Sequence, residues 1–282
     1  MKYTTLVDAA TLAAHRADPA WRVVDCRFEL SSPDAGAAAY AAGHIEGAVY
    51  AHLDHDLAGP RSATSGRHPL PEPAALAATL GRLGIGAGTQ VVAYDDAGGI
   101  YAARLWWLLR WLGHDAVAVL DGGLAAWRAA GGALTARPTT VAPTRFTPRL
   151  RARSHVDADA VAALVAGDAG TLLDARSAER FEGRVEPLDA RAGHVPGARS
   201  HHYARNLGAD GRFLPPDELR ARLTAALAGR APADSVSMCG SGVTACHTLL
   251  AMEIAGLAGA RLYPGSWSEW SRDPARPCAT GL

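Results

Sequence analysis

The chain has 282 residues, of which 49% are hydrophobic and 20% are charged, and this is the composition of a globular protein. Its 28 basic and 28 acidic residues leave no formal net charge, so nothing in the composition favours binding to nucleic acid or to an anionic membrane surface. At this length the chain can form two domains, each with its own hydrophobic core.

The start of the chain has no charged flank followed by an apolar core, so we expect no signal peptide. No apolar run approaches the length of a membrane-spanning helix, and we expect no membrane partner. The cysteines have neither the spacing of a metal site nor a secretory context; they are Cys26, Cys239, Cys246 and Cys278. We therefore expect reduced thiols in a cytoplasmic protein that needs no metal and no organic cofactor.

The first half alternates short apolar segments, typical of buried strands, with longer segments typical of helices. Residues 21–27 predict a strand that ends in Asp-x-Arg, and a Gly-His turn follows at residues 43–48. Residues 90–96 predict a second buried strand, which ends around Asp95, and an Asp-Gly-Gly turn leads to Trp127. Alternating strands and helices predict a parallel sheet covered by helices, which is an α/β fold.

A segment with a different composition separates the two halves. Residues 135–154 are rich in proline and arginine and contain few periodic apolar residues. This composition is typical of an extended linker. We therefore expect a first domain over residues 1–136, a linker over residues 137–154 and a second domain over residues 155–282.

The second half repeats the landmarks of the first half in the same order. Residues 171–176 again predict a strand that ends in Asp-x-Arg, and a second Gly-His turn follows at residues 193–198. Residues 235–239 predict a strand that ends at Cys239, and a Gly-Ser-Trp-Ser-Glu-Trp segment ends at Trp270. Matching landmarks lie 143 to 150 positions apart, and this nearly constant offset indicates duplication of one domain.

The two halves differ at the end of one strand, where Cys239 stands in the second half and Asp95 in the first. A cysteine between a strand and a helix lies close to free backbone N–H groups, whose partial positive charge stabilises a thiolate. Gly240 and Gly242 allow the backbone to curl around the sulfur, so that amide hydrogens can point toward it. Because an aspartate cannot accept a sulfur atom, we expect the second domain to be catalytic and the first to be inactive.

The sequence Cys-Gly-Ser-Gly-Val-Thr-Ala at residues 239–245 resembles the active-site loop of rhodanese-family sulfurtransferases. Its neutral residues resemble the mercaptopyruvate branch, whereas the loop of the thiosulfate branch is basic (C-R-K-G-V-T). The Asp-x-Arg, Gly-His and Gly-Ser-Trp-x-Glu-Trp motifs extend the resemblance over essentially the full chain. The resemblance implies two tandem rhodanese-like domains, each a parallel sheet flanked by helices, with the substrate in the cleft between them.

The resemblance also implies a reaction and its residues. A thiolate of Cys239 takes the sulfur of 3-mercaptopyruvate as a persulfide and passes it to an acceptor such as a thiol, a thioredoxin-type dithiol or cyanide. Ser241 is implied to move a proton together with His68 and Asp54. Close alternatives to Asp54 are present in the same segment, at His52, His55 and Asp56. The remaining loop residues are expected to bind the substrate, and they are Gly240, Gly242, Val243 and Thr244.

The carboxylate of such a donor requires a guanidinium, and Arg180 matches the arginine of the family's Arg-Phe-x-Gly segment. The family's second arginine, in Glu-Pro-Arg, is absent here, because the chain has Leu188 at that position. Arg191 or Arg184 could take its place. A resolving or redox role for Cys246 is a further open hypothesis.

Other classes of protein fit the sequence less well. A cysteine phosphatase or arsenate reductase needs an arginine six positions after its cysteine, and Ala245 occupies that position. The histidines form no cluster with metal-ligand spacing, which argues against a metal hydrolase. Two alternatives stay open within the family: a thiosulfate:cyanide sulfurtransferase and a non-catalytic rhodanese-like binding module.

Overall fold

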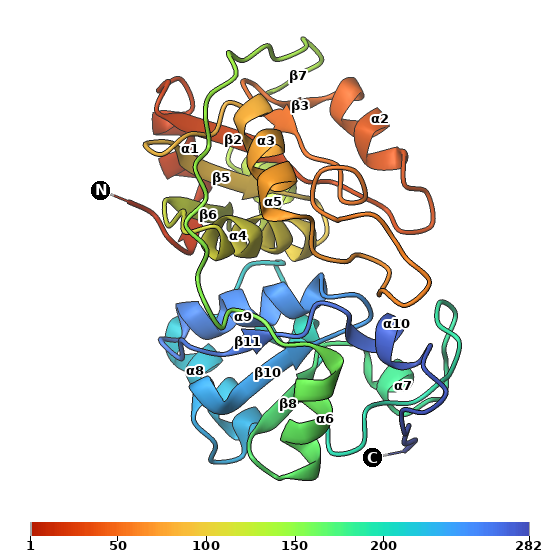
Figure 1. Cartoon of the computed structure of the whole chain (residues 1–282). Coiled ribbons are helices and arrows are strands. Elements are labelled where there is room, and N and C mark those ends of the chain that lie inside the picture. Colours follow the sequence, from red (N-terminus) through yellow and green to blue (C-terminus); the bar gives the residue numbers. More distant parts are fainter. Residues whose placement is uncertain (1, 282) are drawn as a thin grey trace. The chain divides into compact units, whose positions relative to one another are not determined.

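The computed structural model describes residues 2–281 (Figure 1). The described residues divide into two compact units, each built around a parallel sheet. The first unit contains the residues up to Gly59 together with Leu70–Arg151 and Ala209–Arg212. The second unit contains Pro60–Pro69, Ala152–Gly208 and the residues from Phe213 onward.

The main sheet of the first unit is parallel, with the strand order β1-β6-β5-β2-β4. Every residue of the two central strands β5 and β6 is buried, as expected for a parallel sheet with both faces covered. The strands of this sheet are β1 (Leu6–Val7), β2 (Trp21–Asp25), β4 (Val49–Tyr50), β5 (Gln90–Tyr94) and β6 (Val117–Leu120). A separate antiparallel pair is formed by β3 (His44–Ile45) and β7 (Leu134–Thr135).

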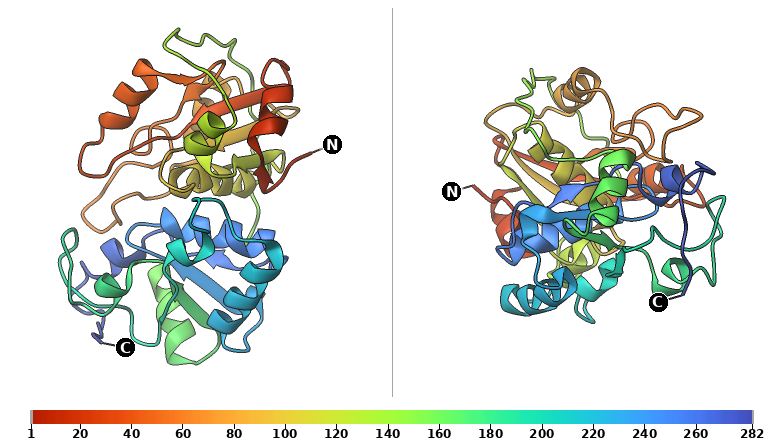
Figure 2. Two further views of the ribbon diagram at one scale, coloured as in Figure 1. Left: turned by 180° about the vertical axis from the view of Figure 1, so that it is seen from behind. Right: turned by 60° about the horizontal axis from the view of Figure 1, so that its bottom comes forward.

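Helices cover the sheet of the first unit (Figure 2). Helix α1 begins after Asp8, whose carboxylate accepts the N–H of Thr11 and so satisfies one of the free donors of the first turn. Nine of the twelve residues of α4 are buried, because this helix packs against β5 and β6. The helices are α1 (Ala9–His15), α2 (Ala35–Ala42), α3 (Pro73–Arg82), α4 (Ile100–Trp111) and α5 (Gly123–Ala129).

The second unit has the same kind of architecture, with a parallel sheet in the order β11-β10-β8-β9. Its strands are β8 (Thr171–Asp174), β9 (Arg199–Ser200), β10 (Ser235–Met238) and β11 (Arg261–Leu262). Its helices are α6 (Ala158–Ala166), α7 (Ala178–Phe181), α8 (Pro216–Leu227), α9 (Thr244–Ile254) and α10 (Ser266–Trp270), with short 3₁₀ turns η1 (Tyr203–Asn206) and η2 (Pro232–Asp234). The core contains the tryptophans of α10, which pack with Met238 and Tyr263.

This architecture confirms the predicted α/β fold with parallel sheets flanked by helices. The predicted linker, residues 137–154, lies between β7 and α6, and these described residues form no helix and no strand. The contacts assign this stretch to the first unit as far as Arg151. The boundaries proposed from the sequence therefore stay a prediction.

Ten residues from the first half of the sequence, Pro60–Pro69, pack with the second unit, and we call this segment the strap. Arg272 Nη1 donates to the carbonyl oxygens of three strap residues, at 3.0 to 3.3 Å. The N–H of Arg67 donates to Ser268 Oγ of α10 at 2.9 Å, beside which the strap lies in Figure 1. A Cβ on Gly66 would lie 2.4 Å from the carbonyl oxygen of Gly265, so only glycine permits this approach.

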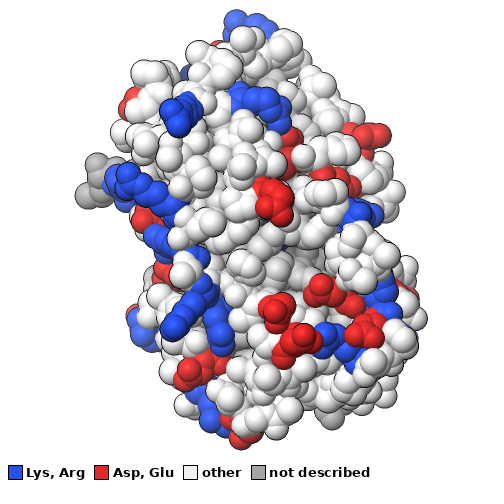
Figure 3. Space-filling view, viewed as in Figure 1, with Lys and Arg blue, Asp and Glu red and all other residues white. Residues whose placement is uncertain are grey.

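The surface carries charges of both signs. On the face shown in Figure 3, basic and acidic side chains are interspersed, in keeping with the formal net charge of zero. Among the described residues, no helix is both long and apolar enough to cross a membrane.

Candidate active site

Cys239 follows the last residue of β10 and precedes α9 by a short loop. Neighbouring segments hold this loop: the N–H of Cys239 donates to Ser266 Oγ at 3.1 Å, and its carbonyl oxygen accepts the N–H of Trp267 at 2.9 Å. The N–H of Gly242 donates to Cys239 Sγ at 3.1 Å. An N–H group directed at the sulfur stabilises negative charge on it, so the loop suits a thiolate or persulfide anion.

Gly242 has a backbone conformation that the loop requires. Its φ is +75°, and a Cβ at this position would lie 2.6 Å from the carbonyl oxygen of Pro264. A residue with a side chain would be strained there and would collide with the backbone. The N–H that faces Cys239 Sγ therefore depends on glycine at position 242.

Cys246 is the third residue of α9 and is fully buried. Its Sγ donates to the carbonyl oxygen of Gly242 at 3.2 Å, and this hydrogen bond helps to fix the conformation of the loop. The four cysteines, all of which are described residues, form no disulfide. This geometry favours a structural role for Cys246, and a resolving or redox role stays a prediction.

The strap brings His68 against the loop. His68 Nδ1 and Ser241 Oγ lie 2.7 Å apart, and both side chains are buried, with 2% and 6% of each residue exposed. The tautomer of His68 determines which atom donates. Two of the three residues expected to move a proton therefore form a hydrogen bond shielded from bulk water.

Asp54, the third of these residues, belongs to the first unit and is half-buried. Its backbone N–H donates to His52 Nδ1 at 3.1 Å, while the N–H of His52 donates to Asp56 Oδ2 at 2.9 Å. The role of Asp54 stays a prediction, and so does the choice between it and its neighbours.

Arg180 lies in α7 and faces the catalytic loop. Its Nη2 donates to Glu186 Oε1 at 2.7 Å and to Asp189 Oδ2 at 3.0 Å, which fixes the guanidinium plane. A Cβ built on Gly240 would lie 3.3 Å from Arg180 Nη1. This places one edge of the guanidinium beside the loop that carries Cys239, as substrate binding requires.

Arg191 and Arg184 use their guanidinium groups elsewhere. Arg191 donates to four backbone carbonyl oxygens near the end of the chain, which belong to Trp270, Ser271, Asp273 and Arg276. Arg184 is exposed and pairs with Glu182 at 2.6 Å. The geometry favours a structural role for Arg191, which anchors the last segment of the chain, over its predicted role in substrate binding.

Val243 and Thr244 stand where the loop becomes a helix. Val243 is the buried residue before the first turn of α9, and Thr244 is half-buried and begins the helix. The N-terminal end of a helix carries partial positive charge, which adds to the stabilisation of an anion in the loop. A direct contact of either residue with substrate stays a prediction.

The corresponding loop of the first unit holds a carboxylate in place of the sulfur. Asp95 Oδ1 accepts the N–H groups of Ala97 and Gly99, and Oδ2 accepts those of Tyr101 and Ala102, all at 2.8 to 2.9 Å. Burial raises the pKa of Asp95, while the four N–H donors act in the opposite direction. The backbone N–H donors of this loop are therefore occupied by the Asp95 carboxylate, which supports the prediction that the first domain is inactive.

The second unit has a cavity of about 230 Å³, and its lining includes Arg61, Arg67 and Arg272. Arg67 and Asp189 line it together with Leu188, which stands where the resemblance implies a second arginine. Neither Arg67 nor Asp189 was among the residues expected at the site from the sequence. The only signal for Arg67 was its position next to His68.

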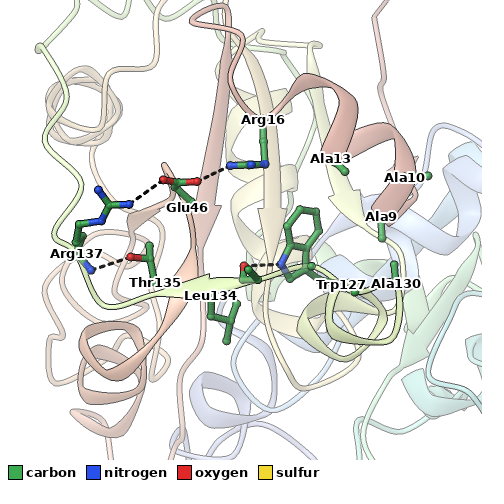
Figure 4. A pocket seen from close by; sticks show the side chains of 13 residues that line it. Ala9, Ala10, Ala13, Arg16, Glu46, Trp127, Ala130, Leu134, Thr135 and Arg137 are labelled. Carbon is green, nitrogen blue, oxygen red and sulfur yellow. Dashed lines mark hydrogen bonds and ion pairs between the residues drawn. The ribbon is translucent and has the colours of Figure 1, made fainter.

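The first unit has a larger cavity, of about 540 Å³, with a different character (Figure 4). Its charged groups pair with one another, because Glu46 accepts hydrogen bonds from Arg16 at 2.6 Å and from Arg137 at 3.3 Å. Its other walls are mainly alanine and glycine, and its lining contains no cysteine, serine or histidine. Nothing in this cavity matches the chemistry of the Cys239 loop.

A model of the rhodanese-like domain matches residues 8–130 and 157–273, which together cover most of the chain. The chain belongs to the rhodanese-like family and contains two tandem copies of the domain. Both the predicted family and the predicted duplication are confirmed.

Three proteins that are similar to this chain over most of its length are named sulfurtransferases. The chain is 50% identical to a probable 3-mercaptopyruvate sulfurtransferase of Pseudomonas aeruginosa over 283 residues, which covers 100% of both chains. It is 32% identical to the thiosulfate sulfurtransferase of Bos taurus, with 95% of this chain and 92% of the relative covered. The solved 3-mercaptopyruvate sulfurtransferase of Leishmania major matches with a TM-score of 0.84 and 33% identity, covering 95% of this chain and 74% of that one. The chain is therefore an enzyme of the sulfurtransferase class.

Proposed function

We propose that this enzyme transfers the sulfur of 3-mercaptopyruvate to a thiol acceptor through a persulfide on Cys239. The observation that carries the proposal is the buried hydrogen bond between Ser241 and His68 within the loop that holds the cysteine. Thiosulfate releases sulfite, which leaves as a stable anion and needs no proton. Mercaptopyruvate releases an enolate, which does need one, so a buried proton donor beside the sulfur favours mercaptopyruvate.

In the first step, the thiolate of Cys239 attacks the sulfur of 3-mercaptopyruvate. A sulfur–sulfur bond forms, the carbon–sulfur bond breaks, and its electron pair remains on the carbon as the enolate of pyruvate. Ser241 gives a proton to the enolate carbon and recovers one from His68. The N–H of Gly242 stabilises anionic sulfur before and after the transfer.

In the second step, an acceptor thiolate attacks the outer sulfur of the persulfide. The new sulfur–sulfur bond forms on the acceptor, and Cys239 leaves as a thiolate, which restores the resting enzyme. We assign the acceptor to small thiols or a thioredoxin-type dithiol, and the compartment to the cytoplasm, where thiols stay reduced. We propose Asp54 as the third residue that takes part in this proton transfer.

Thiosulfate is the second candidate donor. The bovine relative named above supports it, and so do the guanidinium groups beside the loop, which can bind an anion. The loop itself contributes no basic residue between Cys239 and Thr244. We therefore propose thiosulfate as a side activity.

Initial rates with 3-mercaptopyruvate and with thiosulfate test the proposal for three proteins. The unaltered enzyme should prefer 3-mercaptopyruvate, and Cys239→Ser should be inactive with both donors. Cys278→Ser is the matched control, because Cys278 is a half-buried thiol outside the loop, and this variant should keep full activity. A clear preference for thiosulfate would reject the proposed donor and leave the persulfide mechanism standing.

A further inference from the structure

Each unit has a cavity beside its first helix. In the first unit, a cavity of about 540 Å³ lies between α1 and the segment that follows α5 (Figure 4). In the second unit, a cavity of about 550 Å³ lies between α6 and the segment that follows α10. A tryptophan lines both cavities, and its indole N–H donates to a carbonyl oxygen of that segment, from Trp127 to Ala133 at 3.1 Å and from Trp270 to Pro277 at 2.8 Å. The duplicated fold therefore forms this cavity twice.

The linings of the two cavities differ at matching positions. In the repeated turn, Gly-His-Ile is followed by Glu46, whereas Gly-His-Val is followed by Pro196. Arg16 and Val165 match as well, because each lies eight positions after the aspartate that caps the first helix of its unit. Glu46 and Arg16 line the cavity of the first unit, and Pro196 and Val165 line that of the second. The fold therefore requires the cavity but does not require its charged groups.

Three charged side chains meet at the cavity of the first unit. Glu46 Oε2 accepts a hydrogen bond from Arg16 Nη1 at 2.6 Å, and Glu46 Oε1 accepts one from Arg137 Nη2 at 3.3 Å. Figure 4 shows the two guanidiniums approaching this carboxylate from opposite sides. Among the described residues, neither guanidinium has another acceptor, so each keeps N–H groups that can bind a ligand. Each oxygen of Glu46 likewise keeps the capacity to accept a further hydrogen bond.

The rest of this cavity is mainly apolar. Its lining includes Ala9, Ala10, Ala13, Trp127 and Leu134. A Cβ on Gly132 would lie 2.2 Å from Cε2 of the tryptophan, so glycine at this position allows the backbone to cover the indole ring. In Figure 4, Glu46 and Arg137 lie on one side of the view, and the first two alanines of α1 lie on the other. A ligand that fits this cavity therefore combines an apolar group with charged groups at one end.

We propose that this cavity binds a free α-amino acid with an apolar side chain. The guanidiniums of Arg16 and Arg137 donate to its carboxylate, and Glu46 accepts from its ammonium group. The apolar side chain is removed from water against the alanines and Trp127. A simple carboxylate would place two like charges side by side, and the ammonium group of an amino acid offsets this repulsion. The inference goes beyond the proposed function and does not depend on the sulfur donor.

Isothermal titration calorimetry with L-phenylalanine tests the proposal, because a phenyl ring offers a large apolar area. Three analogues each lack one feature: 3-phenylpropanoate has no ammonium group, L-phenylalaninamide has no carboxylate, and glycine has no side chain. Each should bind at least about 10-fold more weakly than L-phenylalanine, the loss that follows from one missing charge-assisted hydrogen bond or one missing buried ring. Equal affinities of L-phenylalanine and any analogue would overturn the proposal, and so would no binding of L-phenylalanine up to about 10 mM.

Two variants change the charged groups separately. Glu46→Gln keeps the shape of the side chain but removes its charge, so L-phenylalanine should bind roughly 10-fold more weakly, whereas 3-phenylpropanoate should bind no more weakly than before. Arg137→Gln should weaken the binding of both ligands by roughly 10-fold. Arg128→Gln is the matched control, because Arg128 is an exposed arginine of the same unit that does not line the cavity. Equal affinities of these three variants for L-phenylalanine would reject the charged groups as ligands.

A third variant tests the location of the site. Ala13→Phe fills the apolar part of the cavity, and Ala14→Phe is its matched control, because both alanines are exposed on α1 and only Ala13 lines the cavity. L-Phenylalanine should raise the melting temperature of the unaltered enzyme and of Ala14→Phe, since a ligand that binds the folded state stabilises it. It should not raise that of Ala13→Phe. An equal increase in both variants would place the amino acid elsewhere and overturn the proposal.

Discussion

Ser241→Ala removes the hydroxyl that lies 2.7 Å from His68 Nδ1. Both residues are almost completely buried, so water cannot readily take the place of the lost oxygen. Proton transfer by a positioned side chain contributes about 100-fold or more to a rate, which corresponds to about 3 kcal/mol of transition-state stabilisation. We therefore expect kcat with 3-mercaptopyruvate to fall by about 100-fold or more.

The assay compares single turnovers with 3-mercaptopyruvate and with thiosulfate. Because sulfite leaves without a proton, persulfide formation from thiosulfate should fall by less than about 5-fold in Ser241→Ala, the loss expected from a neutral hydrogen bond. Melting temperatures show whether the variant is folded. Equal losses with the two donors, or no loss with 3-mercaptopyruvate, would refute the assignment of Ser241 and His68 to proton transfer.

Three further perturbations test other parts of the structure. Arg272→Met removes the donor to three strap carbonyls and should lower kcat, because His68 would be displaced. Arg212→Met is a control in the other unit and should leave kcat unchanged. Equal kcat values for the two variants would show that Arg272 does not position the strap. Gly242→Ala should abolish activity and lower the stability by about 2 kcal/mol or more, because the new side chain is strained at φ +75° and collides with Pro264. An active and stable variant would contradict this expectation. Burial lowers the pKa of His201 below its ordinary 6.5, so the stability that His201 contributes is fully present above pH 6.5 and is lost as the pH falls through the folded-state pKa. His201→Gln should therefore weaken the dependence of the melting temperature on pH. An unchanged dependence would rule out His201 as its source.

The sequence was sufficient to predict the features that depend on local pattern. Apolar strands that end in Asp-x-Arg predicted the parallel sheets, and the nearly constant offset between matching landmarks predicted the duplication. The contrast between Cys239 and Asp95 predicts that the second half carries the nucleophile, and this assignment stays a prediction. The structure adds a reason, since the Asp95 carboxylate occupies the backbone donors of its own loop.

The sequence could not predict contacts between distant segments that have no periodic pattern. The strap joins α10 through a hydrogen bond between residues 201 positions apart, and nothing in its composition indicates that it packs with the second unit. The ion pair between Arg67 and Asp189 could not be predicted for this reason. Arg191 was expected at the substrate because arginines suit carboxylates, yet backbone carbonyls of the last segment compete for the same N–H groups.

The most direct test of the central claim is mass spectrometry of the intact enzyme after brief exposure to 3-mercaptopyruvate without an acceptor. Our account predicts the added mass of one sulfur atom, located by peptide mapping to Cys239 and removed by a thiol acceptor or by cyanide. Cys239→Ser should show no added sulfur. Sulfur carried on Cys246 or Cys278, or pyruvate formed with no sulfur on the protein, would contradict the account.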